Sequence, residues 1–139
     1  MRACELVGKP WVPGGRGPAA FDCWGLVMFW ALEKTGRTLP DFPAEATDVM
    51  AVTRSFQEER KNKTQWEELA KPEIDCVVAM GRNKTINHAG VYIGEGMVLH
   101  CSQDSGKVAI QTIDQLRRQW SSVHFFKFHD WRCSNSKPF

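Results

Sequence analysis

Residues 21–27 read Phe21-Asp22-Cys23-Trp24-Gly25-Leu26-Val27, and this stretch predicts the start of a helix. Asp22 is a good N-cap, because its short side chain can accept a hydrogen bond from an amide of the first turn. Apolar residues follow at helical spacing as far as Leu32, and Gly36 is a typical C-terminal stop. We therefore expect a helix that has Cys23 in its first turn.

The segment before this helix is rich in proline and glycine. Residues 10–18 hold three of each in nine positions, which excludes regular structure. Such a loop can leave the sulfur at the helix start open to a substrate. Backbone N–H groups at that helix start can also face a developing oxyanion.

The second half of the chain has the alternating pattern of strands. The expected strand segments are residues 74–80, 89–93, 97–101, 108–110 and 124–129. Gly94-Glu95-Gly96 reads as the turn of a hairpin, and Thr112 with Gln115 can cap a short helix. Helices followed by antiparallel strands indicate an α+β domain.

The length and composition suit one domain that comprises residues 1–139, with 42% hydrophobic and 24% charged residues. Within it, residues 41–72 read as a helical insertion. Apolar residues recur at i, i+3 and i+7 from Val49, and Thr64 with Glu67 forms a capping-box pattern.

Several classes of protein are disfavoured by the sequence. The five cysteines are an odd number without zinc-type spacing, so we expect neither a disulfide framework nor a metal, and no cofactor. A net charge of +2 does not argue for nucleic acid. No apolar run approaches the ~18–20 residues that span a bilayer, and residues 1–10 lack the apolar stretch of a secretion signal.

Cys23 is the cysteine best placed for chemistry. A nucleophilic cysteine needs its thiolate, which a helix N-terminus and a neighbouring imidazole both favour. Cys76 falls in an apolar strand and Cys101 opens a polar turn, so neither has the helix terminus. The alternative is that Cys23 is a small buried residue of an amphipathic helix.

Two histidines lie on the arms of the predicted hairpin. If residues 94–96 form a three-residue loop, His100 faces Gly90 and lies diagonal to His88 on the same face. A two-residue loop would put the histidines on opposite faces, and a bulge could restore them. The hairpin can thus supply one histidine as a base and another as its orienter. The other two histidines read as structural or surface residues.

These motifs resemble those of NlpC/P60 cysteine peptidases. Residues 21–27 resemble the family's nucleophile motif, usually F-D-C-S-G-L-V, and His88–Gly94 resembles its H-[VA]-G-[IV]-Y-x-G strand. His100 falls where the family has a third polar residue. The resemblance covers about residues 8–36 and 73–110, and it implies a papain-like α+β fold in which a helix carries the cysteine and a sheet carries both histidines.

The resemblance implies a cysteine endopeptidase of peptidoglycan stem peptides, often cleaving after D-glutamate. Cys23 would attack the amide carbonyl to form an acyl-enzyme. His88 would take the thiol proton and give it to the leaving amine, and His100 would orient the imidazole.

The expected substrate contacts are Asp22, Trp11 and Trp24. Asp22 would bind a free amine of the stem peptide as well as cap the helix. Trp11 stands about where many members have a tyrosine that positions substrate, but a tryptophan lacks the phenolic O–H. Trp24 replaces a common serine, a variant that resembles the subgroup found in phage tail proteins.

The Trp24 variant and the missing signal predict a tail-associated cell-wall hydrolase of a phage or prophage. It would be found in the virion tail, or in the host cytoplasm at synthesis, and would act in the bacterial cell wall. The expected partners are the stem peptide and phage tail proteins, without nucleic acid or membrane insertion. The alternatives are an acyltransferase or amidase on the same scaffold, and a non-catalytic tail component whose cleft Trp24 or the insertion blocks.

Overall fold

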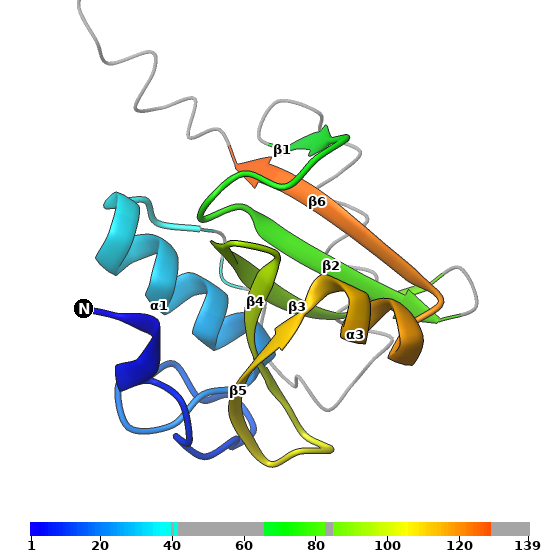
Figure 1. Ribbon diagram of the computed structural model, residues 1–139. Coiled ribbons are helices and arrows are strands. Elements are labelled where there is room, and N and C mark those ends of the chain that lie inside the picture. The colour runs from blue at the N-terminus through cyan, green and yellow to red at the C-terminus, as the bar shows by residue number, and fades with distance from the viewer. Residues whose placement is uncertain (40, 42–65, 83–84, 129–139) are drawn as a thin grey trace, which may run out of the picture.

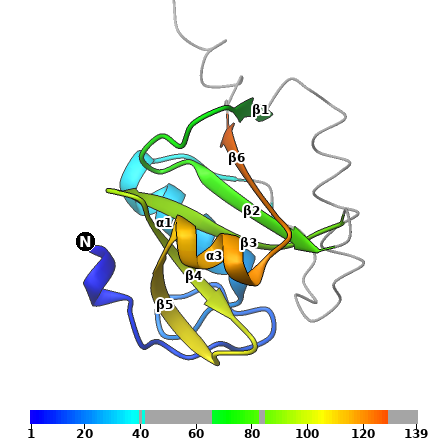
Figure 2. The same cartoon turned by 45° about the vertical axis from the view of Figure 1, so that its right-hand side comes forward.

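The computed structural model describes residues 1–39, 41, 66–82 and 85–128. A six-stranded antiparallel sheet separates two helices, α1 (Cys23–Thr35) and α3 (Ile113–Gln119) (Figure 1). Turning the molecule places α3 in front of the strands and α1 behind them (Figure 2). Over the described ranges, no helix is long and apolar enough to cross a membrane.

The sheet confirms the expected α+β class. Its strands, in spatial order, are β1 (Trp66–Leu69), β6 (Ser122–Phe128), β2 (Val77–Arg82), β3 (Thr85–Gly94), β4 (Met97–Ser102) and β5 (Lys107–Thr112). A short 3-10 helix, η1 (Ala3–Glu5), precedes the loop that leads to α1. β2 begins at Val77 rather than Ile74, because Asp75 has a positive φ of 71° that interrupts extended backbone.

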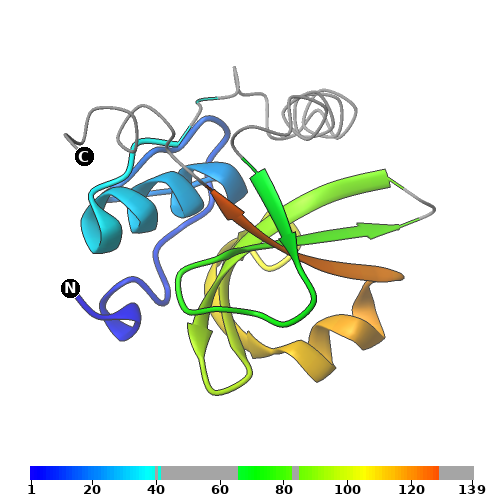
Figure 3. The same ribbon diagram turned by 90° about the horizontal axis from the view of Figure 1, so that it is seen from above.

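Both ends of α1 are as the sequence predicts. The Asp22 carboxylate accepts a hydrogen bond from the Gly25 amide at 2.6 Å. Gly36 ends the helix with a φ of 72°, a conformation that costs glycine little. One set of its buried residues packs against β1, β2, β3 and β6, and another packs against the N-terminal segment together with β3, β4 and β5. Figure 3 shows the helix from above.

The hairpin between β3 and β4 has a two-residue turn, Glu95–Gly96, because Gly94 pairs with Met97. The expected three-residue loop is therefore wrong in length. A bulge before Gly94 restores the register, so Gly90 still pairs with His100. The bulge, which was the other possibility, puts both histidines of the hairpin on one face of the sheet.

Part of the expected helical insertion is a strand. Trp66–Leu69 pairs with β6, and the buried Trp66 ring packs edge-on against Phe128 with centroids 5.0 Å apart. Burial of this ring on the sheet outweighs the local helical preference of the glutamates that follow it. Residues 42–65, the rest of the predicted insertion, and residue 129 of the last expected strand lie outside the described residues.

Candidate active site

The start of α1 brings Cys23 against β3. Cys23 is the first residue of the helix, as expected, and it belongs to the same buried cluster as Ala89. Burial raises the pKa of the Cys23 thiol, and the backbone amide of Ala89 acts in the opposite direction. Ala89 directly follows His88, so Cys23 lies against the strand that carries the expected base, and a contact between the Cys23 sulfur and the His88 ring stays a prediction.

The two histidines of the hairpin are in contact. His88 Nε2 lies 3.0 Å from His100 Nδ1, and both side chains are buried. The far nitrogen of His100, Nε2, lies 2.8 Å from Oε1 of Gln111 on β5. The sequence predicts the first contact. It does not reveal Gln111, whose position depends on the register between β4 and β5.

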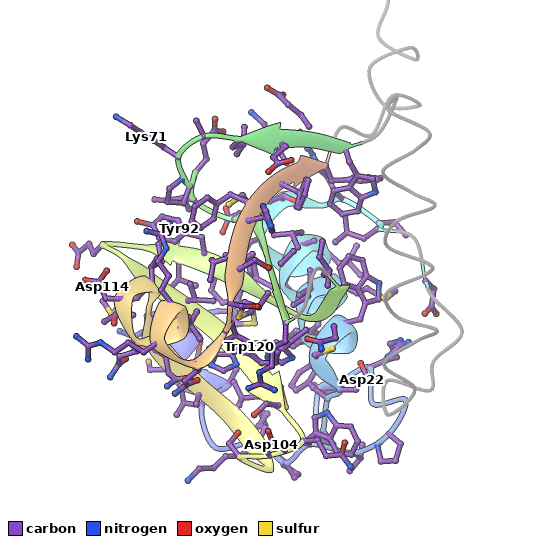
Figure 4. The ribbon with its side chains drawn as sticks, turned by 90° about the vertical axis from the view of Figure 1, so that its right-hand side faces the viewer. Asp22, Lys71, Tyr92, Asp104, Asp114 and Trp120 are labelled. Carbon is purple, nitrogen blue, oxygen red and sulfur yellow. The ribbon has the colours of Figure 1, made fainter. Side chains whose placement is uncertain are left out.

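A flat stack covers one face of the His88 ring. Trp120, just after α3 and labelled in Figure 4, stacks on His88 with centroids 5.3 Å apart and ring planes 10° apart. The Arg82 guanidinium lies over the Trp120 ring, 4.1 Å from its centroid. Neither Trp120 nor Arg82 was predicted as part of the site from the sequence. The signal was an aromatic residue after a well-capped helix, which is weak by itself.

Asp22, which is labelled in Figure 4, is buried at the start of α1. Arg16 forms an ion pair with it. Nη1 of Arg16 lies 2.8 and 2.9 Å from the two carboxylate oxygens, and Nη2 lies 3.0 Å from Asp41. The N-cap role of Asp22 is confirmed, whereas the ion pair with Arg16 was not predicted. A substrate amine at this carboxylate would have to take a place that Arg16 occupies.

The Gly-rich loop closes directly on the helix that carries Cys23. The Asp22 amide donates to the Gly15 carbonyl at 3.0 Å. A Cβ atom at Gly25 would lie 1.8 Å from the same carbonyl oxygen, so no larger residue fits there without moving the loop. Loop and helix therefore meet backbone to backbone beside the cysteine.

A sequence model of the NlpC/P60 family matches residues 8–128, most of the chain. The chain belongs to the NlpC/P60 family. The match includes both motifs by which residues 21–27 and 88–94 resemble that family.

The relatives of this NlpC/P60 domain include longer proteins. A probable endopeptidase of Mycobacterium tuberculosis is 31% identical over 112 residues, which are 81% of this chain and 25% of that protein. A probable endopeptidase of Corynebacterium glutamicum is 28% identical over 110 residues, which are 79% of this chain and 44% of that protein. The chain thus spans less than half the length of these curated relatives.

Solved structures share the fold. The NlpC/p60 domain of the peptidoglycan hydrolase SagA superposes with a TM-score of 0.59 at 18% identity, over 88% of this chain and 91% of that one. NlpC2 from Trichomonas vaginalis gives 0.63 at 19% identity, over 90% of this chain and 43% of that one. At such low identity the likeness shows the NlpC/P60 fold alone.

The two tryptophans predicted to contact substrate have different surroundings. Trp24 is buried beside Trp66, with ring centroids 6.2 Å apart, which favours a packing role in this NlpC/P60 domain. Trp11 is half-buried and packs against a core cluster, and its amide donates to the Gly106 carbonyl at 2.9 Å. A substrate contact by either ring stays a prediction.

The resting form of Cys23 is the thiol. Burial, followed by the charge of Asp22, raises the pKa of Cys23 to about 12, although Arg16 and two backbone amides act in the opposite direction. A thiolate at the helix start stays a prediction, which this raised pKa disfavours for the free protein. Only 5% of the side chain is exposed, and loss of water outweighs the favourable helix terminus.

The His88 imidazole is also neutral at rest. Burial, with smaller contributions from His100 and the Arg82 cation, lowers the pKa of His88 to about 3. Burial likewise lowers the pKa of His100, which a hydrogen bond to Gln111 partly opposes. An uncharged thiol and two uncharged imidazoles are thus the starting state for any chemistry here.

The other described cysteines lack these surroundings. Cys76 is buried as expected, and burial raises its pKa to about 11. Cys101 is not at a polar turn but buried within β4, where its thiol contacts the Phe21 carbonyl at 3.6 Å. Cys4 is exposed. His124 lies 3.1 Å from a carboxylate oxygen of Glu68, which fits the surface role predicted for it.

Proposed function

We propose that this NlpC/P60 domain is a cysteine endopeptidase that hydrolyses amide bonds of peptidoglycan stem peptides through an acyl-enzyme. The observation that carries the proposal is the hydrogen-bonded line of His88, His100 and Gln111, which lies on the sheet against which the start of α1 packs. The names of the relatives, probable endopeptidases and a peptidoglycan hydrolase, support the reaction and the substrate class.

In this proposal Cys23 is the nucleophile and His88 the general base. The thiol proton passes to His88 while the sulfur attacks the carbonyl carbon, because a buried neutral thiol is a poor nucleophile until it loses its proton. Nε2 of His88 faces His100, so we assign the proton transfer to Nδ1. We assign stabilisation of the oxyanion to the N-terminal end of α1, where the helix dipole favours negative charge.

The tetrahedral intermediate formed by this attack then collapses to an acyl-enzyme, which water hydrolyses. The carbon–nitrogen bond breaks, and the leaving amine takes its proton from the His88 imidazolium, which leaves a thioester on Cys23. Water attacks the thioester with His88 as base, which releases a carboxylate and restores the thiol. His100 keeps the imidazole oriented through both proton transfers.

The experiment is digestion of purified peptidoglycan, with the fragments identified by mass. The wild-type chain should release fragments with new amino and carboxyl ends, whereas Cys23→Ala and His88→Ala should release none. Cys4→Ala removes an exposed thiol away from the site and is the matched control. Equal release by Cys23→Ala and the wild type would show that the nucleophile is wrong.

One observation favours a second candidate, a non-catalytic structural component. The Cys23 side chain is almost fully buried and its pKa is raised, as in a structural cysteine. A folded wild-type chain that releases no fragments from peptidoglycan of several chemotypes would favour this candidate.

Association with a phage or prophage tail is a finer proposal. Its support is Trp24 in the nucleophile motif, where serine is common. It predicts that the protein is found in purified virions by mass spectrometry. Its presence in cells free of phage and prophage, without enrichment in virions, would argue against it.

A further inference from the structure

Gln111 stands at the far end of the histidine pair. It pairs with Val98 across β4 and β5, while His100 pairs with Ala109. Residues two apart on a strand share a face, so Gln111 lies diagonal to His100 on the same face. This register brings Oε1 of Gln111 to 2.8 Å from Nε2 of His100, at a partly buried position.

The chemistry of an amide oxygen fixes the protons on both imidazoles. Oε1 can only accept a hydrogen bond, so Nε2 of His100 must carry the proton. A neutral imidazole has one N–H, and burial keeps both rings neutral. Nδ1 of His100 is therefore an acceptor, and Nε2 of His88, 3.0 Å away, must donate to it.

It follows that Nδ1 of His88 has a lone pair. The opposite orientation of the Gln111 amide would present its NH2 group to His100 and reverse every bond of the line. His88 would then carry its proton on Nδ1, where it could not accept one from Cys23. Only the orientation that presents Oε1 of Gln111 to His100 leaves Nδ1 of His88 free to accept the thiol proton.

We infer that Gln111 is a positioning residue: its side-chain oxygen accepts a hydrogen bond from Nε2–H of His100 and so holds His88 in the tautomer that can act as a base. The catalytic role of Gln111 rests on the function proposed above. The assignment of the His88 and His100 tautomers does not depend on that function. Gln111 needs no contact with substrate, because it acts through His100.

The experiment measures the tautomers directly, by imidazole nitrogen chemical shifts of the full ¹⁵N-labelled chain at pH 7. In the wild type, Nε2 of both His88 and His100 should be protonated and Nδ1 of both should not. Gln111→Glu retains an acceptor and should keep this pattern. Gln111→Leu has a similar size but no acceptor, and it should give mixed tautomers.

Peptidoglycan hydrolysis by the same variants gives a second readout. Gln111→Leu should lower kcat about tenfold with little change in KM, because a share of the molecules lacks the base. Gln111→Glu should restore most of the rate. Should Gln111→Leu fail to fold, the wild-type shifts and the Glu variant still test the inference.

Either of two results would overturn the inference. One is a wild-type His88 that is protonated on Nδ1, and the other is a folded Gln111→Leu with unchanged tautomers and an unchanged rate. The expected tautomers in a wild type that digests no peptidoglycan would instead leave the tautomer assignment standing and refute the proposed function.

Discussion

Replacing Arg16 with glutamine removes the cation that faces a fully buried carboxylate. Asp22 has no solvent-exposed surface, so its charge depends on Nη1 of Arg16 and on the Gly25 amide. Loss of one partner of a buried pair costs about 3–5 kcal/mol. Because Arg16 is itself 27% exposed and the Gly25 amide remains, we expect the lower end, about 3 kcal/mol.

That loss is large against a typical stability of about 5–15 kcal/mol. It is measured by urea unfolding, followed by tryptophan fluorescence. With an m value of about 2 kcal/mol per M, the midpoint should fall by about 1.5 M at unchanged m. Arg16→Lys keeps the charge but loses the planar guanidinium. Its urea midpoint should therefore lie between those of the wild type and Arg16→Gln.

Asp41→Asn is the matched control, since it removes a second, more exposed carboxylate on the same guanidinium. Asp41 is 61% exposed, so this pair should contribute only about 0–1 kcal/mol. The reasoning fails if Arg16→Gln costs no more than Asp41→Asn, because the buried carboxylate would then not depend on Arg16.

Three further predictions follow from the same structure. Gly25→Ala should gain about 1 kcal/mol of helix propensity but lose more through the overlap of the new Cβ with the Gly15 carbonyl. Its thermal unfolding midpoint should therefore fall, and a rise would contradict the close approach of loop and helix. Acidification below pH 6.5 should lower the free energy of unfolding by up to about 1.4 kcal/mol per pH unit through His88, because the unfolded chain binds a proton there and the folded chain does not until about pH 3. Urea midpoints at pH 7 and 5 check this, and a slope that His88→Asn leaves unchanged would refute it. His100→Ala should reduce peptidoglycan hydrolysis far less than Cys23→Ala, and equal losses in folded variants would mean that His100 is more than an orienter.

The elements that the sequence predicts well are those with local signals. Asp22 and Gly36 mark the ends of α1, because a cap depends only on residues within one turn. Trp66 shows the limit of such signals. Its strand is stabilised by Phe128 on β6, far along the chain, and no pattern around Trp66 contains that information.

In the candidate site, too, some residues are placed by local sequence signals and others by contacts between distant parts of the chain. The position of Cys23 at the helix start and the contact of His88 with His100 were predictable from a helix cap and from the hairpin, whereas their catalytic roles stay predictions. Gln111 and Trp120 reach the histidines only through the register of β5 and the end of α3. The resting state of the thiol was also beyond the sequence, since burial is a property of the whole fold.

The contact between the Gly-rich loop and α1 has a consequence for how this domain tolerates mutation. The Asp22 amide and the Gly15 carbonyl hold the two segments together, and the space at Gly25 admits no side chain. Exchanges of core side chains can alter rotamers around the site, but they do not change which backbone atoms meet there. Genetic drift in the core should therefore leave the location of Cys23 nearly constant, while the surrounding surface is free to diversify toward new substrates.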